Sequence, residues 1–179
     1  MLIARPAKRD NLGAFNRDML YEIVEGDQPI GNLAFGIDTM RGAITLASKV
    51  YTVQRTSEGR DELLHEALIR AMKGGERPKN PCTLKDDAGR VLALAERTYE
   101  SFAVSRGGES FTFRKKWRPY HLYRSGSEQS LGSVGQRKFF TRLLHMDLPD
   151  EFDRPFQVFL LVLLLGLTLQ NMESLGRSR

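Results

Sequence analysis

The chain has 179 residues, 41% of them hydrophobic and 27% charged, which suffices for one domain with a sizeable core. These proportions exclude a disordered, collagen-like or low-complexity protein. The single cysteine, Cys82, excludes a scaffold held by internal disulfides. The net charge of +5 favours anionic partners, such as phospholipid surfaces or nucleic acid, but does not choose between them.

Residues 1–17 are polar and mixed, and we interpret them as an N-terminal arm that can add one strand. Their apolar piece, Leu2 to Ala4, is much shorter than the roughly 7–15 apolar residues of a secretory signal. We therefore expect a cytoplasmic protein that can lie peripherally at a membrane.

From residue 18 onward, apolar and polar side chains alternate as in half-buried antiparallel strands. Met19, Tyr21 and Ile23 show this alternation first, and it returns at Leu33 and Phe35. Turn clusters follow at regular intervals, at 86–89, 106–108 and 125–127. At about 8–12 residues for a strand and its turn, the segment up to residue 146 holds roughly ten to twelve strands.

One stretch, 61–74, departs from this alternation. Its apolar side chains repeat with a helical period, Asp61 is suited to cap a helix, and glycine follows the last apolar residue. We predict a short helical insertion between strands at 61–74.

The segment 155–171 is the most apolar of the chain and follows a capping residue, Asp153. As a helix, its apolar run at 156–169 would span about 21 Å, against about 30 Å of bilayer hydrocarbon. This length favours a helix buried in protein over a membrane anchor, which stays the alternative. Residues 173–179 are predicted to form a polar tail.

A helix that is apolar on all sides needs apolar partners on all sides. Antiparallel strands supply them if they close into a barrel, because a barrel wider than about eight strands has room for a helix about 10 Å across. The sequence therefore predicts a mainly β protein. Its single domain, 18–172, would form a closed antiparallel barrel of about twelve strands around a central hydrophobic α-helix.

The order of these features resembles the tubby-like superfamily, which includes the phospholipid scramblases and the LURP-one-related proteins. The motifs that carry the resemblance are Tyr21–Asp27 with Ile30-Gly31, Tyr51–Val53, Asp87–Ala93, and Leu148–Phe152 with the apolar segment after it. The resemblance covers residues 19–172. It implies a barrel around a central helix and, as in tubby-type domains, phosphoinositide binding through surface lysine and arginine.

Residues 114–118 form the densest run of positive charge. On a strand, Arg114 and Lys116 would lie opposite Phe111 and Phe113 and point outward. Such a patch fits anionic phospholipid headgroups, although a solvated barrel wall gives the same pattern. The candidate lipid-binding residues are Arg114, Lys115, Lys116, Trp117, Arg118 and Lys138. The aromatic residues fit inward positions and form no stacking platform, so the sequence does not favour nucleic acid.

Four carboxylates precede the apolar segment: Asp147, Asp150, Glu151 and Asp153. The resemblance to scramblases places a calcium-binding stretch here, but the spacing lacks the glycine and the alternating carboxylates of a calcium loop. Carboxylates at a helix N-terminus also stabilise the helix dipole. We favour this capping role and leave calcium open.

The sequence carries no pattern typical of an enzyme. His65, His121 and His145 fall on three predicted elements without metal-ligand spacing, and no phosphate-binding or nucleophile motif is present. We predict a non-catalytic binding module without cofactor or metal, a monomer or weak oligomer, that engages anionic phospholipid headgroups. The alternatives are a scramblase-like or tail-anchored membrane protein, and a barrel that binds protein partners.

Overall fold

The computed structural model describes residues 1–7, 18–36, 41–55, 81–98, 101–116, 119–136 and 143–176, without the side chains of Asp18 and of residues 167–176. Everything below concerns these residues. The predicted helical insertion at 61–74 lies outside them.

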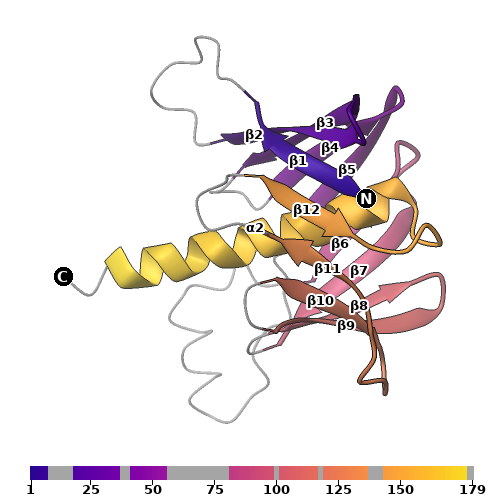
Figure 1. The fold of residues 1–179 in the computed structure, drawn as a ribbon, viewed down its shortest axis with the longest axis vertical. Helices are drawn as coiled ribbons and strands as arrows, with labels where there is room; N and C mark the ends of the chain where they lie inside the picture. Colours follow the sequence, from indigo (N-terminus) through magenta and orange to yellow (C-terminus); the bar gives the residue numbers. More distant parts are fainter. Residues whose placement is uncertain are drawn as a thin grey trace.

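Twelve antiparallel strands form a closed barrel in which each strand pairs with its neighbours in the sequence (Figure 1). The barrel closes where β1 pairs with both β2 and β12. The strands are β1 (Leu2–Pro6), β2 (Asp18–Glu25), β3 (Gln28–Gly36), β4 (Arg41–Leu46), β5 (Lys49–Arg55), β6 (Cys82–Lys85), β7 (Val91–Arg97), β8 (Ser101–Arg106), β9 (Glu109–Lys115), β10 (Tyr120–Arg124), β11 (Ser130–Gly135) and β12 (Leu144–Asp147). This confirms the predicted mainly β fold with about twelve strands.

The strands follow the alternation seen in the sequence. On β9, Phe111 and Phe113 are buried in the core, whereas the alternate residues Thr112 and Arg114 face outward and are half-buried. The turn after β8 consists of two glycines, residues 107 and 108, with φ angles of +56° and +84°. Such left-handed angles at both positions match the twist of a tight hairpin and favour glycine.

Helix α2 (Arg154–Gly176) begins directly after Asp153 and runs through the barrel (Figure 1). The Oδ1 atom of Asp153 accepts the backbone N–H of Phe156 at 2.9 Å, which caps the helix as predicted. Apolar side chains of α2 join the strands in one buried core: Phe156, Val158, Phe159, Leu160, Leu161, Val162, Leu163, Leu164 and Leu165. Each such side chain stabilises the fold by about 1.5–3 kcal/mol. The apolar segment thus has the buried role that its length favours.

Two predicted boundaries change. The N-terminal segment 1–17 is not only an arm, because its residues Leu2–Pro6 are the strand that closes the barrel, so the barrel begins at residue 2 and not at residue 18. The helix continues to Gly176 instead of ending at residue 171, so most of the predicted polar tail is helical. Polar residues can continue a helix into solvent with little loss of free energy. The end of the apolar pattern therefore does not mark the end of the helix.

The barrel has two ends, which we name after the helix. At the entry mouth lie the start of α2 and the turns 25–28, 46–49, 85–91, 106–109 and 124–130. At the exit mouth lie the opposite strand ends, and the C-terminal part of α2 extends beyond them (Figure 1). Because the barrel is a simple meander, every second connection lies at the same mouth.

Candidate functional site

Of the predicted basic cluster, the structure describes Arg114, Lys115 and Lys116, and these three residues do not lie together on the barrel wall. Arg114 lies on the outer wall, where its guanidinium forms an ion pair with Glu128 at 2.8 Å and lies 4.5 Å above the ring of Tyr123. A guanidinium that is paired and stacked in this way is held in place by its own protein. Arg114 therefore has a structural role on the wall.

Lys115 and Lys116 differ from Arg114 because they lie at the exit mouth. Both side chains are exposed, and neither pairs with a carboxylate among the described residues. The other three predicted residues, Trp117, Arg118 and Lys138, lie outside the described part of the chain.

Further cations that sequence analysis did not single out surround the same mouth. They come from strands spread around the barrel, namely β1, β4, β5 and β7. We call the whole set the exit-mouth cations: Arg5, Arg41, Arg55, Arg97, Lys115 and Lys116. The set leaves out Arg114, which lies on the wall. Two acidic residues lie at the described strand ends of this mouth, Asp18 and Glu96. Sequence analysis missed these residues because they are far apart in the chain. In a meander, every second strand ends at the same mouth, so cations at those strand ends indicate a shared positive mouth.

The entry mouth has the opposite composition. Its turns and the segment before α2 carry many carboxylates. Glu128 is left out because it pairs with Arg114 on the wall. The others are Glu25, Asp27, Asp86, Asp87, Glu109, Asp147, Asp150, Glu151 and Asp153. Fewer cations accompany them: Lys49, Lys85, Arg90, Arg106, Arg124 and Arg154. Among the residues that the structure describes, the barrel thus has a negative and a positive end.

Most entry-mouth cations neutralise a carboxylate of the protein itself. Arg106 pairs with Asp153 at 2.8 Å, Arg124 pairs with Glu109 at 3.1 Å, and Arg154 pairs with both Glu25 and Asp150. These contacts tie the start of α2 to the strands around it. They account for the charges without a ligand.

Asp86 is fixed in the same way at the turn after β6. Its carboxylate is 8% exposed and accepts the backbone N–H of Arg90 at 2.8 Å and the guanidinium of Arg90 at 2.7 Å. Burial on its own would raise the pKa of Asp86, but the hydrogen bonds from Arg90 outweigh it and hold the pKa below its usual value.

The acidic segment before α2 has the capping role that we favoured. Asp153 caps the helix and pairs with Arg106, and Asp150 pairs with Arg154 at 3.5 Å. Within the described ranges, no group of three or more histidine, cysteine or acidic side chains is close enough to hold a metal ion. Asp153 and Asp150 therefore act on the start of α2 through their charges.

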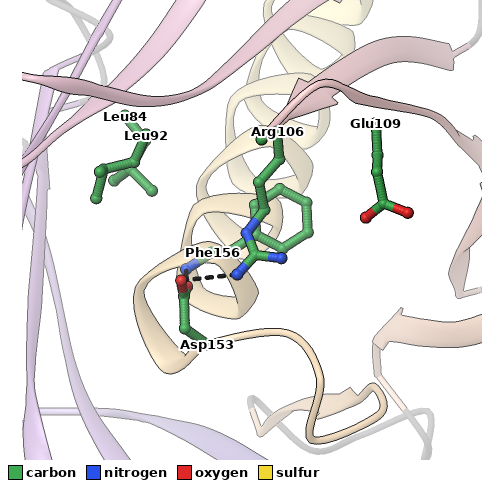
Figure 2. A pocket seen from close by; sticks show the side chains of 7 residues that line it. Leu84, Leu92, Arg106, Glu109, Asp153 and Phe156 are labelled. Atoms are coloured by element: carbon green, nitrogen blue, oxygen red, sulfur yellow. Dashed lines mark hydrogen bonds and ion pairs between the residues drawn. The ribbon is translucent and has the colours of Figure 1, made fainter.

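A pocket of about 360 Å³ opens at the entry mouth beside the start of α2 (Figure 2). Its walls combine apolar side chains with three charged ones: Leu84, Leu92, Arg106, Gly107, Glu109, Asp153 and Phe156. The guanidinium of Arg106 lies 5.1 Å from the ring centre of Phe156 and 5.7 Å from that of Phe152. Figure 2 shows Arg106 reaching toward Asp153, with the carboxylate of Glu109 on the other side.

Two side chains with nucleophilic atoms, Ser130 and Cys82, are not activated in the structure. The hydroxyl of Ser130 donates to the carbonyl of Gly132 at 3.1 Å, so at the 2.9 Å contact with His121 Nδ1 it is the imidazole that donates. Burial, opposed weakly by Arg55, raises the pKa of Cys82 to about 12. At neutral pH neither side chain is a nucleophile.

Comparison of this chain with protein-family models, with curated proteins and with solved structures finds no match. The resemblance to the tubby-like superfamily therefore stays a prediction. In the described part of the chain, no helix combines the length and the apolar character needed to cross a membrane.

Proposed function

We propose that the protein is a non-catalytic binding module of the tubby-like kind that docks its exit mouth on anionic membrane surfaces. The observation that carries the proposal is the separation of charge between the two mouths. The exit-mouth cations come from five strands around the barrel, and carboxylates are scarce among them.

The arrangement of these cations favours an extended anionic surface over a single small anion. They come from strands spread around the opening, at β1, β4, β5, β7 and β9. By the alternation of each strand, inward-facing positions are held by Arg55, Arg97 and Lys115. Outward-facing positions are held by Arg5 and Arg41. Near an anionic leaflet, each lysine or arginine contributes about 1 kcal/mol of attraction.

The negative entry mouth supports the same orientation. A molecule with opposite charges at its two ends is turned by the field of a charged surface before contact. An anionic membrane attracts the exit mouth and repels the entry mouth, so the N-terminal residue, which lies at the entry mouth, would face away from the lipid.

Flotation with vesicles tests the proposal. Vesicles of phosphatidylcholine with phosphatidylserine should bind the full chain at low salt, and vesicles of phosphatidylcholine alone should not. Raising the salt should weaken binding, because the charges involved are solvent-exposed. Reversal of both lysines at the exit mouth, Lys115→Glu with Lys116→Glu, should lower binding by at least about tenfold.

The matched control makes the same change of charge at the other mouth. Lys49 and Lys85 lie at the entry mouth, and Lys49→Glu with Lys85→Glu should leave vesicle binding within about twofold of the unaltered chain. Equal losses from the two double variants would show that net charge alone drives binding. That result would contradict a docking surface at the exit mouth.

A further inference from the structure

The pocket at the entry mouth arises from the way α2 sits in the barrel. The helix lies mainly against β4, β5, β6, β11 and β12. The pocket occupies the side that this position leaves open, where its walls come from β6, β7, β8 and β9 (Figure 2). Small side chains on β7, Ala93 and Ala95, face the core next to it.

A break in strand pairing shapes the wall of this pocket. Leu84 pairs with Ala93 and Lys85 pairs with Val91, so Leu92 between them has no partner on β6. Such a bulge changes the direction of a side chain, and Leu92 lines the pocket together with Leu84 and Phe156. The pocket therefore has an apolar wall from three elements.

Among the charged side chains that line the pocket, Arg106 has hydrogen-bond donors to spare. Both oxygens of Asp153 are engaged, one by the N–H of Phe156 and one by Arg106, and Glu109 is neutralised by Arg124. Arg106 makes one hydrogen bond among the described residues, to Asp153, although a guanidinium has five N–H groups. Figure 2 shows its other terminal nitrogen pointing away from Asp153.

The residues around Arg106 hold its guanidinium in one position. Its side chain is 24% exposed, and its guanidinium is held by the Phe152 and Phe156 rings and by Asp153. A guanidinium fixed in this way loses little freedom when it binds a second carboxylate, and arginine suits carboxylate geometry. At the α2 N-terminus, the N–H of Phe156 is used by the Asp153 carboxylate, the N–H of Gln157 by the Asp153 carbonyl, and Pro155 has no N–H.

We propose that this pocket binds a small amphipathic carboxylate, with its carboxylate on Arg106 and its apolar chain against Leu84, Leu92 and Phe156. The volume of the pocket lies at the lower end of the range for ligand sites, about 300–1,000 Å³, which suits a short chain. This site lies at the mouth opposite to the exit-mouth cations and does not depend on membrane docking.

Titration with octanoate, followed by the methyl NMR signals of the full chain, tests the site. Octanoate should shift the signals of Leu84 and Leu92 in a saturable way. Octylamine, which has the same chain and the opposite charge, should bind at least tenfold more weakly at these methyls. Equal or tighter binding of octylamine would overturn the assignment of a carboxylate ligand.

Two variants locate the site. Leu92→Trp fills the pocket and should lower octanoate affinity at least tenfold, whereas Leu94→Trp, on the outward side of the same strand, should not change it. Arg106→Gln should also lower affinity at least tenfold, and Arg106→Lys should restore part of it.

Octanoate binding by the exit-mouth double variant distinguishes this site from the exit mouth. Lys115→Glu with Lys116→Glu should leave octanoate binding unchanged. Absence of any octanoate shift in the unaltered chain, or full affinity in Leu92→Trp, would overturn the proposal. Because Leu92 is only partly buried, that variant should stay folded even if Arg106→Gln loosens the start of α2.

Discussion

The two mouths of the barrel carry charges of opposite sign, and they also use their charges differently. At the entry mouth, Arg106, Arg124 and Arg154 each pair with a carboxylate of the same protein. At the exit mouth, Lys115 and Lys116 are exposed and have no such partner among the described residues. Among the described residues, the entry mouth thus pairs most of its cations within the protein, whereas the two lysines of the exit mouth have no carboxylate partner.

This difference shows why the number of charges in a sequence run is a poor guide to a site. Arg114 belongs to the densest basic run, yet Glu128 and Tyr123 occupy its guanidinium. Arg41 stands alone in the sequence and lies exposed at the exit mouth. A dense basic run in the sequence therefore does not by itself show which guanidinium groups a membrane surface can reach.

The largest effect is expected from the aromatic cluster beneath the entry mouth. Phe156 is fully buried and its ring lies 5.4 Å from Phe152 and 6.2 Å from Phe111. Phe156→Ala should lower the free energy of unfolding by about 3–5 kcal/mol, because it leaves a cavity where α2 enters the barrel. Chemical denaturation measures this. The exposed residue Val50 at the same mouth is the control, and Val50→Ala should change stability by less than about 0.5 kcal/mol.

A smaller loss should follow from removing the cap of α2. Asp153→Ala deprives the Phe156 N–H and Arg106 of their shared acceptor and should cost about 1–2 kcal/mol of unfolding free energy. The side chain of Asp150 is 89% exposed, so Asp150→Ala should cost less than about 0.5 kcal/mol. If Asp153→Ala and Asp150→Ala lowered the stability equally in thermal unfolding, the cap and the ion pair of Asp153 would not stabilise the entry mouth.

The pKa of Asp86 predicts how stability at the entry mouth depends on pH. Because the folded state lowers this pKa below its ordinary value of 3.8, the ionised carboxylate stabilises the fold above that pH. The contribution is lost as the pH falls through the lowered pKa. Asp86→Asn should therefore be less stable than the unaltered chain at pH 7, and the difference should shrink as the pH falls below 3.8. A difference that stays constant over this range would contradict the account.

The smallest effect concerns His121, which lies beside the exit mouth. Burial, and to a lesser degree the charge of Lys116, lower the pKa of His121 below its ordinary value of 6.5. Lys116→Gln should raise this pKa, and binding of anionic vesicles to the unaltered chain should raise it as well. NMR titration of the imidazole signals measures both shifts. An unchanged pKa in the variant would place Lys116 away from His121.

The sequence predicted the barrel well because its signals are local. Alternation marks the strands, the glycines at 107 and 108 mark a tight turn, and Asp153 marks the start of α2. Each of these features depends on a few neighbouring residues. The number of strands and the burial of the apolar segment follow from them.

The site was harder to predict because it depends on contacts between distant residues. Arg106 and Asp153 are 47 positions apart, and their pairing depends on where α2 enters the barrel. The pairing of Arg114 with Glu128 depends on how the turn after β10 folds back on the wall. The closing role of β1 likewise requires β2 and β12 to meet around it.

The orientation on a membrane is the central claim, and a matched pair of labels tests it directly. Gln28 is exposed at the entry mouth and Gln136 is exposed at the exit mouth, so a polarity-sensitive fluorophore can be attached in Gln28→Cys and Gln136→Cys. Cys82 is buried and its raised pKa of about 12 keeps it unreactive, so the label goes to the introduced thiol. With phosphatidylserine-containing vesicles, the label at position 136 should shift to the blue and the label at position 28 should not. A response at position 28 alone, or equal responses at both positions, would contradict docking through the exit mouth.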